Sequence, residues 1–126
     1  MKVDCDKTTT VYFGNQPPCT GCLTIYKYND KNGDGDYDPG WPYYESYLSG
    51  WVFTATDSQG KSWLGTTGTR GYVTICNLPA GSYTVAETPK EGWTNTDPKD
   101  GSGTKTVTVS CGTTETVKFG NTYKRC

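Results

Sequence analysis

Histidine is absent from this sequence. Without an imidazole, the chain cannot build the Ser–His or Cys–His pairs of many hydrolases, and most zinc enzymes are excluded as well. The sequence also lacks an excess of positive charge. It has 12 lysines and arginines and 13 aspartates and glutamates, which gives a formal net charge of −1. A nucleic-acid-binding domain would need a basic surface. No apolar run approaches the roughly 18–20 residues of a membrane span, so the sequence predicts neither nucleic-acid binding nor a membrane span.

Hydrophobic residues make up only 33% of the chain, and methionine occurs once. Glycine (16), proline (7) and tyrosine (10) are plentiful instead, which is typical of β-structure with many turns. The 126 residues suffice for one domain with or without a short appendage. Short alternating runs bounded by turn residues predict strands at 8–14, 22–29, 50–57, 62–66, 71–77, 82–88, 104–110 and 114–121. Strands of this length and spacing predict an all-β antiparallel sandwich or barrel.

The six cysteines of this short chain indicate disulfide bonds and a location outside the cytosol. They are Cys5, Cys19, Cys22, Cys76, Cys111 and Cys126. The sequence does not choose among the possible pairings; our trial pairing joins Cys76 to Cys111 within the sandwich and leaves disulfides between units open. Because no apolar signal segment follows Met1, we expect a mature fragment or one unit of a longer chain.

The two ends of the chain resemble each other. Residues 3–15 (VDCDKTTTVYFGN) parallel residues 109–121 (VSCGTTETVKFGN), with the Val, Cys, Val and Phe-Gly-Asn positions at a constant offset. We therefore expect residues 1–18 to form an extra N-terminal strand that resembles the last strand, and residues 19–126 to form the sandwich. The extra strand would be ordinary, the remnant of a tandem array, or donated to a neighbouring copy through Val11, Phe13 and Asn15.

Three predicted strands carry a polar side chain where the pattern calls for an apolar one. Side chains alternate between faces along a strand, so Lys27, Glu87 and Asn121 each continue the apolar face of their own strand. If these faces line the core, an amine, a carboxyl group and a carboxamide are buried together and must pair, lose their charge or react. Each could instead sit at a strand end and reach water, but the coincidence on three strands favours burial.

Several segments resemble the collagen-adhesin B-type (Cna-B) domains of bacterial surface proteins and pilins, and the related B domains of serine-aspartate-repeat adhesins. These segments are IYKYND at 25–30, LPAGSY at 78–83, VAETP at 85–89 leading to Gly92-Trp93, and VKFGN at 117–121. The resemblance spans about residues 22–122 of the chain. It implies a prealbumin-like, immunoglobulin-like β-sandwich at a cell surface.

In many members of that family, a Lys on the first strand and an Asn on the last form a spontaneous isopeptide bond that a Glu promotes. The resemblance places these roles on Lys27, Asn121 and Glu87. The chemistry is reasonable, because burial favours the neutral forms of an amine and a carboxyl group, and a neutral amine is a nucleophile. The reaction would occur once per molecule, so the chain is not expected to be an enzyme. Asn15 corresponds to Asn121, so a bond to the Lys27 of a neighbouring copy is also conceivable.

Residues 30–38 (DKNGDGDYD) place oxygen-bearing side chains at alternate positions with glycine at the sixth, as in the first part of an EF-hand loop. The twelfth position is Trp41 rather than Glu, so the loop is not a standard EF-hand. It is similar to the calcium loops of serine-aspartate-repeat B domains, where a later carboxylate completes the site. The predicted Ca²⁺ ligands are Asp30, Asn32, Asp34, Asp36, Asp38 and Glu45. A solvated turn is the alternative.

Two functions follow from these patterns. The first is an extracellular structural domain of a surface fibre, stalk or adhesin, which binds other copies of itself head-to-tail and is stiffened by cross-links and Ca²⁺. The alternative is a carbohydrate-binding module that binds host or environmental glycans through exposed aromatic side chains, with Trp41, Trp51, Trp63 and Trp93 as candidates. Packing in the core is the other role that these aromatic residues could have.

Overall fold

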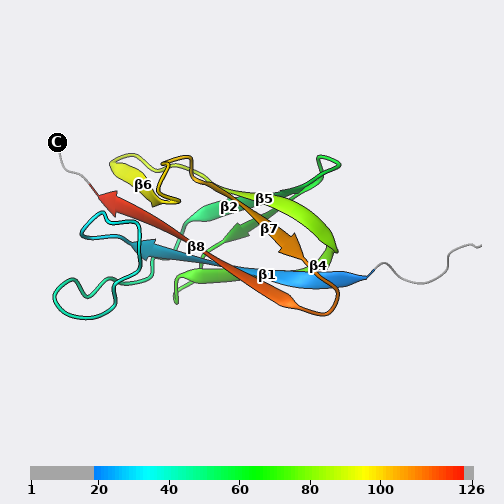
Figure 1. Cartoon of the computed structure of the whole chain (residues 1–126), viewed down its shortest axis with the longest axis horizontal. Helices are drawn as coiled ribbons and strands as arrows, with labels where there is room; N and C mark the ends of the chain where they lie inside the picture. The colour runs from blue at the N-terminus through cyan, green and yellow to red at the C-terminus, as the bar shows by residue number, and fades with distance from the viewer. Residues whose placement is uncertain (1–18, 124–126) are drawn as a thin grey trace, which may run out of the picture.

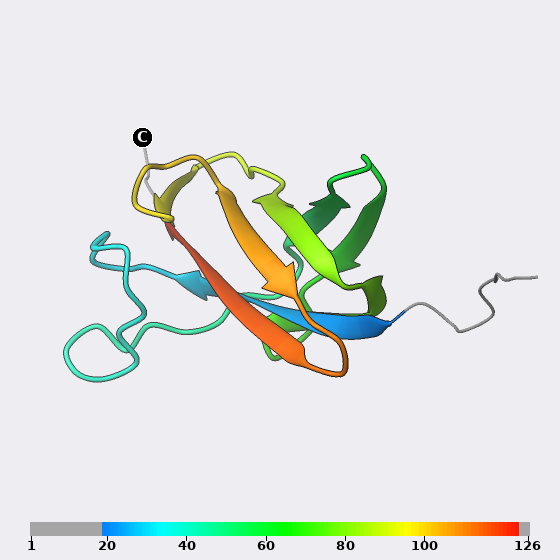
Figure 2. The same ribbon diagram turned by 45° about the vertical axis from the view of Figure 1, so that its right-hand side comes forward.

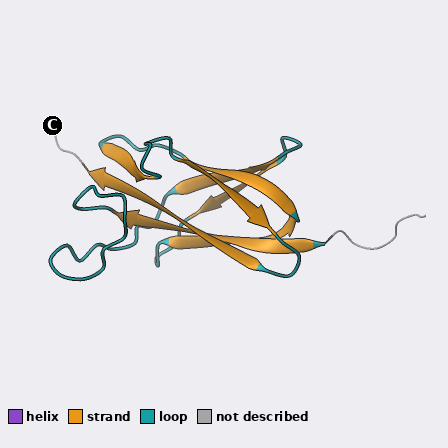
Figure 3. Cartoon of the chain, viewed as in Figure 1, coloured by secondary structure: helices purple, strands orange, loops and turns teal. Residues whose placement is uncertain are grey.

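A computed structural model describes residues 19–123, which form eight strands in two facing sheets (Figure 1). The strands are β1 (Thr20–Asn29), β2 (Val52–Asp57), β3 (Ser62–Thr66), β4 (Tyr72–Pro79), β5 (Gly81–Glu87), β6 (Trp93–Asp97), β7 (Thr104–Val109) and β8 (Thr114–Tyr123). Strands and loops account for this whole part of the chain (Figure 3). It contains no helix that could cross a membrane. The all-β fold predicted from the sequence is confirmed.

The strand order is β4-β1-β8-β6 in one sheet and β3-β2-β5-β7 in the other. All pairs are antiparallel except β1 and β8, which run parallel with Lys27 opposite Phe119 and Asn29 opposite Asn121. Figure 2 shows these two long strands side by side. The sandwich is therefore not purely antiparallel, because its first and last strands are neighbours that run in the same direction.

Every strand predicted from residue 22 onward coincides with an observed strand. The sequence pattern missed β6, whose segment WTNTD offers little apolar alternation because most of its side chains are half-buried at a sheet edge. The predicted strand at 8–14, with Val11 and Phe13, lies outside the described residues, as does Asn15. So does the proposed boundary between residues 1–18 and the sandwich.

The hydrophobic core lies between the two sheets and is built from the inward-facing positions of the strands. The rings of Phe53 on β2 and Phe119 on β8 lie 5.0 Å apart and join the sheets. The buried hydrophobic side chains of this core are Leu23, Ile25, Trp51, Phe53, Ala55, Leu78, Tyr83, Val85, Val109 and Phe119. Seven partly buried hydrophobic side chains pack around this set: Leu48, Trp63, Val73, Ile75, Trp93, Val107 and Val117.

Two disulfide bonds connect β1 to its surroundings. Cys22 on β1 bonds to Cys76 on β4, and Cys19 bonds to Cys111 in the β7–β8 turn. The trial pairing of Cys76 with Cys111 is therefore wrong. Cys76 pairs with Cys22 because of the strand order. β4 is the direct neighbour of β1, and the Cα atoms of Cys22 and Cys76 lie 4.1 Å apart. Cys5 and Cys126 lie outside the described residues.

The long β1–β2 connection folds back and pairs with the end of β1. Tyr47 forms a β-bridge with Tyr28, and its ring stacks on that of Tyr37 at 4.6 Å between centroids. The ring of Tyr26 also packs against that of Tyr47, at 4.9 Å between centroids. Tyr28 is completely buried as a result, so the far end of β1 is covered on both faces.

The backbone of Gly120 on β8 packs against the ring of the buried Tyr28, because a Cβ atom there would overlap that ring. We expect Gly120→Ala to lower the free energy of unfolding by about 1–3 kcal/mol, since a packed ring must move. Urea titration measures this change. Gly40→Ala is the matched control, because a Cβ at Gly40 meets no atom within 4 Å; equal losses in the two variants would contradict the packing argument.

Candidate functional site

Lys27, Glu87 and Asn121 meet between the sheets, as their registers predicted. Lys27 and Asn121 come from the parallel neighbours β1 and β8, while Glu87 ends β5 of the opposite sheet. The Lys27 Nζ atom donates hydrogen bonds to Glu87 Oε1, at 2.9 Å, and to Asn121 Oδ1. Asn121 Nδ2 in turn donates to Glu87 Oε2 at 3.0 Å. The exposed fractions are 0%, 9% and 1% for Lys27, Glu87 and Asn121, so the three side chains close a ring of hydrogen bonds away from water.

Burial lowers the pKa of Lys27 to about 8, although the charge and the hydrogen bond of Glu87 oppose this change. The Nζ atom lies 4.2 Å from the centre of the Trp51 ring, which is itself buried. An apolar wall thus covers the amine and removes the water that would stabilise its charge. The neutral, nucleophilic form of Lys27 is consequently far more accessible here than it is for a lysine in solution.

The arrangement brings a nucleophile, an amide and a proton carrier into contact. Each carboxylate oxygen of Glu87 touches a different nitrogen atom: Oε1 contacts the Lys27 amine and Oε2 contacts the Asn121 amide. A single carboxyl group placed in this way can accept a proton from one nitrogen and deliver a proton to the other. The geometry is therefore suited to the transfer of the Asn121 acyl group from one nitrogen to another.

A fourth polar residue, Asn95 on β6, joins this cluster. Asn95 Nδ2 lies 3.1 Å from Asn121 Oδ1 and 3.3 Å from the Gly120 carbonyl oxygen, while Asn95 Oδ1 accepts a hydrogen bond from Gly103 N at 3.1 Å. Sequence reasoning missed Asn95 because it missed β6. The only local signal was the Gly92-Trp93 pair that opens this strand.

The acidic loop after β1 brings three of the predicted metal ligands together. Asp30, Asp34 and Glu45 each place a carboxylate oxygen within 4.8 Å of the others. Asp30 is fully buried, and its Oδ1 atom has no hydrogen-bond partner in the described part of the chain. An unpaired buried carboxylate oxygen is costly unless a cation or a proton satisfies it. This donor set of hard oxygen atoms fits Ca²⁺.

The other predicted ligands divide into two groups. Asn32 and Asp38 lie beside the acidic cluster, with Asn32 Nδ2 donating to Asp38 Oδ2 at 3.2 Å. Glu45 Oε1 accepts from the backbone N of Asp38 at 2.6 Å, so the loop closes around Glu45, and burial raises the pKa of Glu45. Asp36 points elsewhere, because its Oδ2 atom lies 3.7 Å from Lys99 Nζ on the surface.

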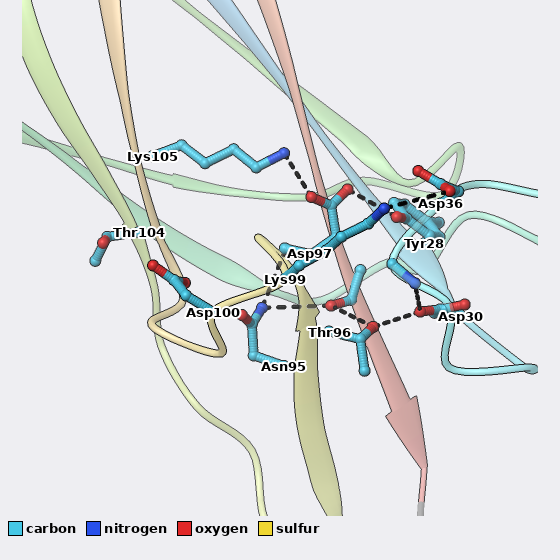
Figure 4. A network of polar contacts seen from close by, with 12 residues as sticks. Tyr28, Asp30, Asp36, Asn95, Thr96, Asp97, Lys99, Asp100, Thr104 and Lys105 are labelled. Atoms are coloured by element: carbon cyan, nitrogen blue, oxygen red, sulfur yellow. Dashed lines mark hydrogen bonds and ion pairs between the residues drawn. The ribbon is translucent and has the colours of Figure 1, made fainter.

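The loop and the buried cluster are connected through Asp30. Its backbone N donates to the Asn121 carbonyl oxygen at 2.8 Å, and its Oδ2 atom accepts from Thr96 Oγ1 at 2.5 Å. Figure 4 shows the contact between Thr96 and Asp30. Beside it lies a second network, in which Asp97 accepts from the Tyr28 hydroxyl, at 2.7 Å, and pairs with Lys105 Nζ, at 2.8 Å. Polar contacts therefore run without a break from the acidic loop to β6 and β8.

The four tryptophans proposed for glycan binding differ in their surroundings. Trp51 is 2% exposed, and Trp93 packs edge-on against it with ring centres 5.6 Å apart. Trp63 packs against Tyr83 at the same separation. Trp41, which is 80% exposed, is the member of this set that faces water. Three of the four rings therefore have packing roles.

The two-sheet fold and the cluster of Lys27, Glu87 and Asn121 define a prealbumin-like sandwich of the Cna-B type. The chain belongs to the family described as the SpaA prealbumin-like fold domain, which matches residues 44–123. A comparison with curated protein sequences finds no match.

Solved structures of bacterial proteins share the fold. The Bacillus anthracis TIE protein is 24% identical, with a TM-score of 0.60 over 83% of this chain and 17% of that one. The minor pilin GBS52 of Streptococcus agalactiae is 20% identical, with a TM-score of 0.64 over 94% of this chain and 51% of that one. The shaft pilin SpaA of Lactobacillus rhamnosus GG is 18% identical, with a TM-score of 0.59 over 84% and 51%. The chain thus spans about half or less of these structures.

Proposed function

We propose that this chain is an extracellular structural domain of a surface fibre, stalk or adhesin. The observation that carries the proposal is the buried contact between Lys27 and Asn121, which joins the first strand to the last. Similar folds occur in proteins named as minor and shaft pilins, and this supports the same role here. The two disulfides agree with a location outside the cytosol.

In this proposal Lys27 and Asn121 form an isopeptide bond. The neutral Lys27 amine attacks Cγ of Asn121, so that a C–N bond forms while the bond from Cγ to Nδ2 breaks. Glu87 accepts a proton from Nζ and delivers one to Nδ2, which leaves as ammonia. No oxidant or cofactor is needed, and the chain loses one molecule of ammonia. Glu87 returns to its starting state, but the chain reacts once and is not an enzyme.

Such a bond would suit a domain under tension. Force entering at Cys19 and leaving at Tyr123 would pass from β1 to β8 through the Lys27–Asn121 bond. This route would bypass the segment between residues 27 and 121. The Cys19–Cys111 disulfide offers a second covalent route into β8.

Intact-mass spectrometry of the reduced protein tests the isopeptide. We expect the chain to weigh one ammonia less than its sequence mass, and Lys27→Ala and Asn121→Ala each to restore the full mass. Lys105→Ala is the matched control, because Lys105 pairs with Asp97 rather than with an amide. The full sequence mass in the unmodified chain would reject the bond.

We further propose that the acidic loop binds Ca²⁺ through Asp30, Asp34 and Glu45, with Asn32 and Asp38 at the edge of the site. The support is the carboxylate cluster and the buried, unpaired Asp30 Oδ1 atom. Asp36, also a predicted ligand, would have to leave Lys99 to take part. The cation would offset the repulsion between the carboxylates and hold the loop in place.

Thermal unfolding with and without Ca²⁺ tests this site. A concentration of 100 times the dissociation constant should add about 2.7 kcal/mol to the free energy of unfolding and raise Tm. Asp34→Asn and Glu45→Gln should remove the response, while Glu91→Gln, at an exposed position outside the cluster, should keep it. A Tm that Ca²⁺ and a chelator leave unchanged would contradict the proposal.

Head-to-tail association between copies is the third part of the proposed function. In β8, Phe119 and Asn121 are buried while Lys118 is exposed. The N-terminal copy of this sequence carries Phe13 and Asn15 at the equivalent positions, so it has the residues that a β8-like strand needs. Adding such a strand to another copy would supply backbone hydrogen bonds as well as apolar burial.

Light scattering across a concentration series tests the association. We expect oligomers in the unmodified chain and mainly monomers in Val11→Asp/Phe13→Asp, because these side chains would enter the partner. Tyr12→Asp is the control, since Tyr12 corresponds to the exposed Lys118 and would face away from the partner. A monomer at every concentration would rule out the association.

A further inference from the structure

Asn121 Oδ1 accepts hydrogen bonds from two different elements of the fold. One donor is the Lys27 amine on β1, and the other is Asn95 Nδ2 on β6, at 3.1 Å. These donors have different fates if the isopeptide forms. The Lys27 nitrogen becomes the attacking atom and bonds to Cγ, whereas Asn95 keeps its place beside the oxygen.

We propose that Asn95 is a catalytic residue of the Lys27–Asn121 reaction, whose side-chain amide stabilises the negative charge that develops on Asn121 Oδ1. This inference rests on the isopeptide reaction proposed above and adds a role that Lys27, Glu87 and Asn121 do not supply. As the new C–N bond forms, the electron pair of the carbonyl double bond moves onto Oδ1. It returns when ammonia leaves. Asn95 donates a hydrogen bond throughout and neither gains nor loses a proton.

The surroundings of Asn95 fix which end of its amide faces Asn121. Its Oδ1 atom accepts from the backbone N of Gly103 at 3.1 Å. Its Nδ2 atom lies near three acceptors: Asn121 Oδ1, the Gly120 carbonyl oxygen at 3.3 Å and the Asp97 carbonyl oxygen at 3.2 Å. Turning the amide over would place an oxygen against these three oxygens and an NH₂ group against an N–H. The donor is therefore held toward the reacting carbonyl before the reaction begins.

Gly103 in the β6–β7 turn positions two members of the site. Its N–H holds Asn95, and its carbonyl oxygen accepts a hydrogen bond from the backbone N of Glu87 at 2.9 Å. Its φ of +69° is one that glycine adopts without strain, and a Cβ there would lie 3.2 Å from Cγ of Glu87. One turn thus fixes both the proton carrier and the hydrogen-bond donor, and this limits the rearrangement needed during the reaction.

The test measures how fast the bond forms in the full chain. The protein is synthesised in a short cell-free pulse under oxidising conditions, sampled over time, quenched in acid, reduced and weighed. The rate constant is read from the fraction that has lost one ammonia. We expect Asn95→Asp, which keeps an acceptor for Gly103 but removes the amide donor, to slow the reaction about 100- to 1,000-fold. Thr94→Ala, on an exposed position of the same strand, should match the unmodified chain.

A pH series separates catalysis from a purely structural role. In the Asn95→Asp variant, the new carboxyl group gains a hydrogen-bond donor when it takes up a proton. The rate constant of bond formation in Asn95→Asp, divided by that in Asn95→Ala, should therefore rise as the pH falls. The thermal stability of both variants is compared in a Lys27→Ala background, where no bond can form, to account for any loss of folded protein.

The possible outcomes bear on different claims. An unmodified chain that keeps its full mass overturns the isopeptide and, with it, the role of Asn95. A chain that loses ammonia at the same rate with Asn95→Asp overturns the role of Asn95 alone. A ratio of the two variant rates that does not change with pH likewise overturns the role of Asn95 alone.

Discussion

The burial of one amine imposes the strongest constraint on this fold. A lysine side chain that ends inside a small core is unfavourable unless its charge is matched or removed. Glu87 supplies a carboxylate from the opposite sheet, and Asn121 supplies an amide from the adjacent strand. Both partners reach Lys27 only when the two sheets face each other in this register and β8 lies beside β1. The polar cluster therefore depends on the same register and strand pairing as the hydrophobic core around it.

The parallel pairing of β1 and β8 also explains the positions of one disulfide bond and of the Lys27–Asn121 contact. The Cys19–Cys111 disulfide sits where this pair of strands begins, and the contact between Lys27 and Asn121 sits near its other end. Parallel neighbours cannot be joined by a tight turn, and most of the described chain separates these two strands in sequence. The disulfide compensates for this separation because it reduces the freedom of the unfolded chain, and the hydrogen bond between Lys27 and Asn121 holds the other end of the pair in the folded state.

Local sequence patterns predicted most of the strands, the buried polar residues and the acidic loop, because each of these depends on neighbouring residues in the sequence. Alternating side chains located most of the strands and showed that Lys27, Glu87 and Asn121 continue apolar faces. Oxygen-bearing residues at alternate positions located the acidic loop. The pattern did not reveal that Cys22 would lie beside Cys76, because the neighbours of a strand are set by the packing of the whole sheet. It missed Asn95 for a related reason: β6 is an edge strand whose mixed burial leaves no alternation to detect.

The position of Asp30 links the two polar regions into one structure. Its backbone N–H holds the carbonyl of Asn121, and its side chain holds Thr96, the residue after Asn95. An ordered acidic loop therefore restrains the main chain on both sides of the carboxamide that Lys27 touches. Apolar burial is non-directional, so it does not by itself set the orientation of these polar side chains. Directional hydrogen bonds and covalent links supply this restraint instead, which explains how a chain so poor in hydrophobic residues can hold a lysine, a glutamate and two asparagines in one defined geometry.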